Sequence, residues 1–158
     1  MASVQKTIMD AVRTAVLASP LSGRGYTSDN TRLRRRSMLD GMGDGKKCIV
    51  SQFPEQYIGD EATNEQDDIG YGVLITLAHA GNANPEYTDT FDDLIIDREA
   101  LRKFFHNTPE RITPTLPAGS FYYGLKVEPG PMLIAEHSKN NIDATALILR
   151  IFVRETHS

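Results

Sequence analysis

The chain has 158 residues, of which 40% are hydrophobic and 24% charged, and its net charge at pH 7 is −4. This length and composition suit a globular protein with one core, and the acidic balance gives no general attraction to nucleic acid. Cys48 is the only cysteine, so an internal disulfide and a multi-cysteine zinc site are excluded, and a buried free thiol is expected. The sequence shows neither a secretory signal nor an apolar stretch that could span a bilayer, so we expect a chain made and kept in a reducing cytoplasm.

The first predicted element is an amphipathic helix from Val4 to Ala18. Its apolar residues recur at helical spacing, Ser3 can cap its start, and Pro20 follows its end. The next stretch, at about residues 23–46, is rich in Gly, Ser, Asp and Arg, which predicts a long mobile loop. Four of its arginines either form a short β-edge or remain disordered: Arg32, Arg34, Arg35 and Arg36.

A short strand from Lys47 to Phe53, closed by Pro54, is predicted next. The following stretch, Glu55 to Asp68, has no Lys or Arg and predicts a second mobile loop, acidic and solvated. Its six acids are Glu55, Asp60, Glu61, Glu65, Asp67 and Asp68. From Ile69 to Ala80 the residues alternate clearly, which predicts a half-buried strand. Its apolar face holds Ile69, Tyr71, Val73, Ile75 and Leu77.

A second helix is predicted after a loop over residues 81–88. Thr90 can cap it, with Asp93 three residues on, and residues 107–109 stop it. Its apolar stripe consists of Phe91, Leu94, Ile95, Leu101, Phe104 and Phe105. A strand from Phe121 to Glu128, a turn at residues 129–131, a further short strand over residues 132–136 and a polar turn over residues 137–141 follow.

The final predicted strand, Asp143 to Glu155, has two largely apolar faces. One face carries Thr145, Leu147, Leu149, Ile151 and Val153, and the other Ala144, Ala146, Ile148, Arg150, Phe152 and Arg154. Side chains alternate across a strand, so one face serves the core of the chain itself. The second face needs another cover, from a helix of the same chain or from another subunit.

The order helix, strands, helix, strands predicts an α+β fold. We expect a mostly antiparallel β-sheet with two α-helices packed on one face, joined by long loops. With no internal repeat and no long linker, residues 1–158 are expected to form a single domain.

No motif predicts catalysis, a cofactor or a metal. The glycines of residues 41–45 lack the spacing and the context of a phosphate loop, and the four histidines show no metal-ligand spacing. The carboxylates early in the second helix complement its dipole: Asp92, Asp93, Asp97 and Glu99. We therefore expect no enzyme, although the many acids leave a hidden carboxylate pair open.

The segment from Arg24 to Lys47 has seven basic residues and three acidic ones. Three interpretations of this basic segment stay open. It can hold phosphates, meet an acidic patch on a neighbouring subunit, or be a plain solvated loop.

The order of elements resembles the small tail-terminator and tail-completion proteins of tailed bacteriophages. The resemblance spans an N-terminal helix, a basic loop, a short strand ending in Pro, an acidic insertion and a strong strand (IGYGVLITL, residues 69–77). A helix (IDREALRKFF, residues 96–105) and a closing strand (ALILRIFVRE, residues 146–155) complete it.

This resemblance implies a virion protein that forms a ring, typically of six copies, at the head-proximal end of the tail tube. Such a ring ends tube polymerisation and joins the tail to the head-neck connector, with DNA passing through its lumen without sequence-specific binding. Its partners would be other copies, the tail tube protein and the connector, with no membrane and no cofactor. The alternatives are another neck component, such as a head-tail connector or stopper, or a small cytoplasmic ligand-binding domain or enzyme.

The resemblance also gives the second face of the final strand a use. Of the two covers, we favour a partly intersubunit one, in which its arginines meet acidic neighbours. The candidate interface residues are Arg32, Arg34, Arg35, Arg36, Ile148, Arg150, Phe152 and Arg154.

The acidic stretch Glu55 to Asp68 is expected to face the lumen, where like charge would keep DNA from adhering. Reversing these charges should slow DNA ejection without preventing ring formation. The measurement is the infection rate of phage carrying the reversed segment, and an unchanged rate would contradict the lumen placement.

Overall fold

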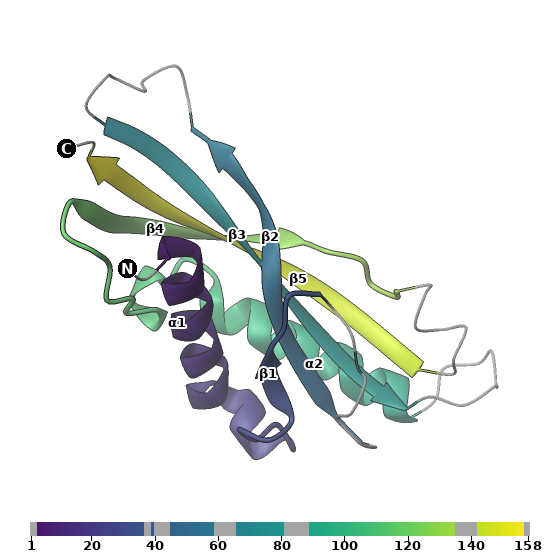
Figure 1. Cartoon of the computed structure of the whole chain (residues 1–158). Helices are drawn as coiled ribbons and strands as arrows, with labels where there is room; N and C mark the ends of the chain where they lie inside the picture. The colour runs from purple at the N-terminus through teal and green to yellow at the C-terminus, as the bar shows by residue number, and fades with distance from the viewer. Residues whose placement is uncertain are drawn as a thin grey trace.

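The computed structural model describes residues 3–36, 39, 45–58, 66–80, 89–134 and 142–156. Within these ranges, five strands form one sheet in the order β1-β2-β3-β5-β4 (Figure 1). The strands are β1 (Thr31–Leu33), β2 (Lys47–Tyr57), β3 (Gln66–Ala80), β4 (Ser120–Pro129) and β5 (Ile142–Thr156). Only the short β1–β2 pair is parallel in this sheet, so the expected α+β fold with a mostly antiparallel sheet is confirmed.

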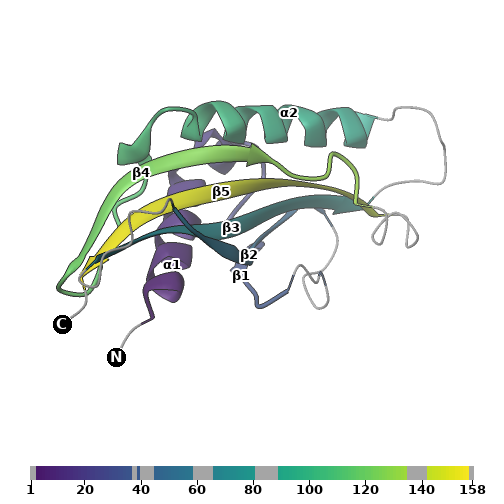
Figure 2. The same ribbon diagram turned by 90° about the horizontal axis from the view of Figure 1, so that it is seen from above.

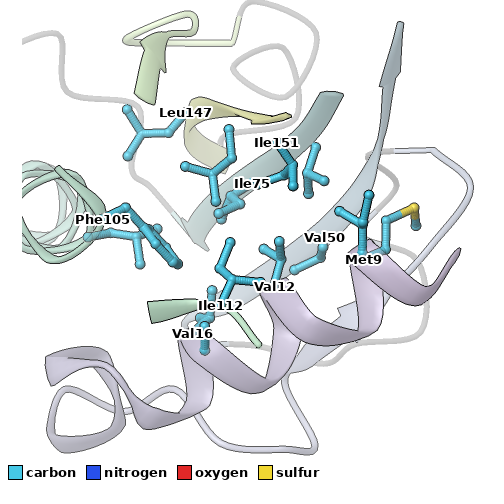
Figure 3. Packing of buried hydrophobic residues seen from close by; sticks show 14 of the residues in the cluster. Met9, Val12, Val16, Val50, Ile75, Phe105, Ile112, Leu147 and Ile151 are labelled. Carbon is cyan, nitrogen blue, oxygen red and sulfur yellow. The ribbon is translucent and has the colours of Figure 1, made fainter. Parts of the chain in front are cut away.

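Both long helices, α1 (Val4–Ala18) and α2 (Asp89–Phe105), pack against one face of the sheet (Figure 2). α1 contacts β1, β2 and β3, whereas α2 contacts β3, β4 and β5. Side chains from both helices and from this sheet face point toward one another in the core, among them Val12, Phe105 and Ile75 (Figure 3). Each fully buried side chain of this size stabilises the fold by about 1.5–3 kcal/mol.

α1 has the predicted bounds. The Ser3 hydroxyl accepts a hydrogen bond from the backbone N–H of Lys6 at 3.3 Å, as an N-cap does. At the other end, Ser19 leaves the helical conformation and its hydroxyl donates to the Val16 carbonyl at 2.6 Å. A 3₁₀ turn, η1 (Pro20–Gly23), follows directly.

The predicted loop at about residues 23–46 is more ordered than its composition suggested. The β-edge alternative is correct for Arg32, which lies in β1, while residues 37, 38 and 40–44 lie outside the described ranges. Tertiary contacts order this segment. Tyr26 is buried, and Arg13 of α1 donates to the carbonyl oxygens of Ser28 and Thr31 at 2.9 and 2.8 Å.

Two predicted boundaries around the acidic stretch were wrong. β2 does not end at Pro54 but continues to Tyr57 through a bulge between Phe53 and Gln56. β1 pairs only with residues 48–50, so no strand next to Pro54 on that side needs a backbone N–H donor. Proline, which lacks this N–H, can therefore lie within β2. β3 begins at Gln66, three residues before the predicted start.

The acidic stretch is therefore not one loop from Glu55 to Asp68. Glu55 lies in β2, and Asp67 and Asp68 lie in β3. Asp60, Glu61 and Glu65 fall outside the described residues.

The second half of the chain largely follows the prediction. α2 begins at Asp89, so Thr90 lies inside the helix and is not its cap. The predicted stop is confirmed at Asn107, whose φ of 49° ends the helix in the left-handed region. A second 3₁₀ turn, η2 (Pro109–Arg111), then leads toward β4.

The region between β4 and β5 differs from the prediction. Residues 132–134 form no strand, although the Ile134 N–H donates to the Ala144 carbonyl at 2.8 Å. The remainder of the predicted short strand and the polar turn after it, residues 135–141, lie outside the described ranges.

Gly72 of β3 is required by a close approach between strands. A Cβ atom at this position would lie 2.8 Å from both the Cβ and the carbonyl oxygen of Phe53 on β2. Backbone atoms cannot move aside at small cost, so the gap between β2 and β3 here admits only glycine.

We expect Gly72→Ala to lower the free energy of unfolding by about 1–3 kcal/mol, because the added methyl group overpacks this site. Gly23→Ala is the matched control, since its Cβ would meet nothing within 4 Å, and it should leave stability unchanged or slightly raised. Urea denaturation measures both values. Equal stabilities of the two variants would contradict the close approach.

Candidate functional site

The helix-free face of the sheet presents exposed aromatic rings beside an arginine. Tyr123 and Phe152 stack with ring centres 6.1 Å apart, and the Arg154 guanidinium lies 5.6 Å from the centre of the Tyr123 ring. Phe121, which pairs with Arg154 across β4 and β5, is 65% exposed. We call Phe53, Phe121, Tyr123, Phe152 and Arg154 the open-face surface.

Glycines make room for large side chains on this face. A Cβ on Gly124 would lie 3.2 Å from the Phe152 ring, and one on Gly70 would lie 2.8 Å from Cδ of Arg150. The Phe152 and Arg150 side chains can therefore lie across the neighbouring strands, whereas any larger residue in place of these glycines would push them off the sheet.

Arg150 lies beneath the open-face surface and ties four strands together. Its side chain is 2% exposed, and Nη1 donates to the carbonyl oxygens of Pro54 at 2.6 Å and Gly70 at 3.1 Å. Nη2 donates to the Glu128 carboxylate at 3.3 Å, and the guanidinium lies 5.7 Å from the centre of the Phe53 ring. Arg150 thus supports the surface from inside the chain.

Arg154 is held at the rim of the same face. Its Nε and Nη2 donate to the two carboxylate oxygens of Asp68 at 2.8 and 3.0 Å. This bidentate hydrogen bonding to Arg154 lowers the pKa of the Asp68 carboxyl below its usual value. The hydrogen bonds to Asp68 hold the Arg154 guanidinium over the Tyr123 ring, while the Arg154 side chain remains 49% exposed.

The structure separates the predicted interface residues into two groups. Ile148, Arg150, Phe152 and Arg154 share the helix-free face, where Ile148 is 9% exposed and Phe152 is half-buried. The four arginines of residues 32–36 lie at the β1 edge, where Arg32, Arg35 and Arg36 are exposed and Arg34 is half-buried. Of the predicted lumen residues, Glu55 is exposed on β2, and Asp67 and Asp68 lie on β3.

A buried charge network joins α2 to the segments before β1 and β2. Asp97, with no side-chain exposure, accepts hydrogen bonds from Arg24 Nε and from the Tyr26 hydroxyl at 2.8 Å, and pairs with Lys46 at 2.9 Å. Asp93 pairs with the same two cations, Arg24 at 2.9 Å and Lys46 at 3.0 Å. Two carboxylates thus meet two cations within the chain.

The role expected for Asp97 from its position near the helix start was incomplete. Burial first, and then the Asp97 charge, raise the pKa of Tyr26 far above its ordinary value, so this phenol stays protonated as a donor. The burial of Asp97 could have been predicted from the helical spacing. Asp97 lies three residues after Leu94 and four before Leu101, on the buried stripe of α2.

Arg98, the residue after Asp97 in α2, is a buried cation that sequence reasoning missed. Its Nη1 donates to the Thr145 hydroxyl at 2.6 Å and the Ala146 carbonyl at 2.5 Å, and its Nη2 donates to the Gly130 carbonyl at 3.2 Å. Burial lowers its pKa, with a smaller effect from Arg102. Arg98 therefore fastens the turn after β4 to β5 and α2.

Cys48 is buried, as predicted, and burial raises the pKa of its thiol to about 12, so it carries no thiolate at neutral pH. In the described ranges, no three or more His, Cys, Asp or Glu side chains gather as metal ligands would. No described helix has the length and apolarity to cross a membrane.

Comparison with known proteins gives no assignment. No protein-family model matches the sequence, and no curated protein matches it significantly. The functional argument therefore depends on the surfaces of this chain.

We expect Asp97→Asn to lower the free energy of unfolding by about 3–5 kcal/mol, because it leaves two partly buried cations short of a counter-charge. The matched variant Asp93→Asn should cost less than about 1 kcal/mol, since the Asp93 side chain is 48% exposed. Urea denaturation at pH 7 measures both losses. Similar losses would show that Asp97 is not the centre of the network.

Proposed function

We propose that this chain is a structural virion protein of a tailed bacteriophage that assembles into a ring of six copies. The ring sits at the head-proximal end of the tail tube, ends its polymerisation and joins it to the head-neck connector. The observation that carries this proposal is the open-face surface, whose exposed aromatics and fixed arginine are suited to a contact between subunits.

The composition of the open-face surface supports an interface. Aromatic residues and Arg are enriched in the contacts that contribute most of the binding free energy between proteins. Tyr123 is 41% exposed and Phe121 is 65% exposed, so both rings can lose further apolar area to a neighbour.

Pre-organisation also supports an interface. The Phe152 ring lies over Gly124, and Asp68 holds Arg154 in place. Because these side chains are already fixed, a contact here costs less conformational entropy than one made by mobile side chains.

The acidic end of the β2–β3 hairpin is the part of the ring that we propose faces the lumen. Glu55 is exposed near the end of β2, and Asp67 lies at the start of β3. Asp68 contributes less free negative charge to the lumen because Arg154 neutralises it within the chain.

Phe152→Asp should give a folded monomer, because a carboxylate in the contact would be desolvated without a partner. Sedimentation velocity reads the assembly, and circular dichroism with urea denaturation reads the fold. Tyr57→Asp is the control. Tyr57 is 67% exposed and pairs with Ile69, whose side chain faces the helices, so Tyr57 lies away from the open-face surface. The Tyr57→Asp protein should therefore still assemble into the ring of six copies.

Tyr123→Asp serves as a second variant in case the half-buried Phe152 is needed for folding. A folded Tyr123→Asp protein that still forms the ring would contradict the proposed contact. A wild-type protein that stays monomeric at high concentration, with no rings in negative-stain micrographs, would contradict the proposed function.

A further inference from the structure

We propose that neighbouring copies in this ring meet head to tail through the two ends of β4. The turn that follows β4 in one copy inserts Met132 and Leu133 into a groove beside the start of β4 in the next copy. This contact rests on the proposed ring. It extends the open-face surface, because Phe121 and Tyr123 of that surface also line the groove.

The turn after β4, residues 130–133, presents apolar side chains to solvent. Met132 is 52% exposed and Leu133 is 48% exposed. The turn contains Pro131 and directly follows Pro129, and each proline fixes its own φ angle. None of the residues 130–133 is charged. We call this segment the β4 turn.

Contacts with β5 and α2 hold the β4 turn in place. The Ala146 N–H donates to the Pro131 carbonyl at 2.9 Å. The buried Arg98 donates to the carbonyl oxygens of Gly130 and Pro131, each at 3.2 Å. A Cβ on Gly130 would lie 2.6 Å from the Ala146 carbonyl oxygen, so the β4 turn lies directly against β5.

This rigidity makes the β4 turn suited to insertion into a partner. Removing a cation from water costs free energy, and the buried Arg98 is here used to fix a turn whose apolar residues remain in solvent. Because the turn is already ordered, little conformational entropy is lost when its side chains bind. Methionine is also among the residues enriched in contacts between proteins.

The groove lies between the segment that follows α2 and the start of β4. It has a volume of about 700 Å³, and Glu110 is the one charged residue among its described lining residues. Phe121 and Tyr123 are 65% and 41% exposed, so an apolar occupant would remove a large aromatic area from water. The apolar and aromatic lining includes Ile112, Pro114, Leu116, Phe121, Tyr122 and Tyr123.

The β4 turn and the groove lie at opposite ends of β4 (Figures 1 and 2). At the groove end, Phe121 pairs with Arg154 of β5. At the other end, the N–H of Ile134, just after the β4 turn, donates to the carbonyl of Ala144, ten residues from Arg154 along β5. At about 3.3 Å per residue the two ends are about 30 Å apart, so a copy cannot fill its own groove.

Polarity and continuity favour a second copy of this chain as the occupant. The β4 turn and the groove are both poor in charge, although 24% of the residues in the chain are charged, and the cores of protein interfaces are depleted in charge. The groove also adjoins the surface on which the proposed ring depends. A contact between unlike surfaces is heterologous, and its repetition closes a ring when the rotation permits.

Leu133→Asp tests the β4 turn. The Leu133 side chain is exposed, so the variant should fold, but in the apolar groove a carboxylate would lose its water without gaining a partner. Assembly of this variant should need a protein concentration about tenfold or more above that of the wild type. Sedimentation velocity measures assembly, and circular dichroism checks the fold. Tyr57→Asp is again the control, because it places the same carboxylate at an exposed apolar residue outside the contact.

A disulfide tests the direction of the contact. Thr113 is exposed and lines the groove. A chain with both Thr113→Cys and Leu133→Cys should form a ladder of linked copies on a non-reducing gel after mild oxidation with copper phenanthroline. Either substitution alone should give no linked product, because the contact joins unlike surfaces. The native Cys48 is buried and its thiol pKa is raised, so it should not react.

Lys6→Cys with Leu133→Cys is the matched control for the disulfide. Lys6 is exposed on α1 and does not line the groove, so this pair should stay unlinked.

Each other outcome has a distinct meaning. A Leu133→Asp ring as stable as that of the wild type, or a Thr113→Cys, Leu133→Cys protein that stays unlinked, would overturn the head-to-tail contact and leave the proposed ring intact. Linked products from either single-cysteine variant would show that like surfaces meet, and would overturn the contact as well. A monomeric wild type would overturn both this inference and the proposed function.

Discussion

The register of β3 against β5 is the constraint on which the rest of the structure depends. The two strands pair over fifteen residues each, from Gln66↔Thr156 to Ala80↔Ile142, in consecutive register. Side chains alternate with a period of two, so a slip of one residue would exchange every inward side chain for an outward one. Leu147 and Leu149 would then leave the helices, and Arg150 would enter the core. The large cost of such a slip holds both faces of the sheet in place together.

The same register explains why large side chains can lie across the helix-free face. It sets Gly72 opposite Arg150 and Gly70 opposite Phe152. Arg150 can therefore cross β3 and reach the Pro54 carbonyl at the β2 bulge, where a larger side chain at residue 70 would block it. Alternation of large apolar residues with glycine in β3 serves the core on one side and leaves room for the aromatic surface on the other.

The sequence predicted accurately those elements whose hydrophobic spacing is regular along the chain. The bounds of α1 and the inward faces of β3 and β5 follow from helical and alternating spacing. The predictions failed where the local structure depends on contacts with segments that are distant in the sequence. Pro54 continues a strand because β1 is too short to need a backbone N–H at that position. The sequence left open whether the arginines of residues 32–36 form a β-edge, and Arg13 and β2 supply the partners that make residues 31–33 a strand. Asp97 was assigned to the helix dipole, although its cationic partners, Arg24 and Lys46, come from segments that the fold alone brings together. The four interface candidates on β5 were found by alternation, but alternation does not tell the buried Arg150 from the exposed Arg154.

The charged residues of this chain divide into buried ones that stabilise the fold and exposed ones that are accessible to a partner. Asp97, Arg98 and Arg150 are buried and bond within the chain, so they stabilise the fold and offer little to a partner. Among the exposed charges, arginines gather at the β1 edge, whereas α2 exposes the acidic Asp92 and Glu99 together with the basic Arg102 and Lys103. Apolar contacts contribute most of the affinity between proteins, whereas paired charges mainly decide which surfaces meet. In the proposed ring, the exposed aromatic side chains would therefore supply most of the affinity, and the exposed charges would decide which surfaces meet.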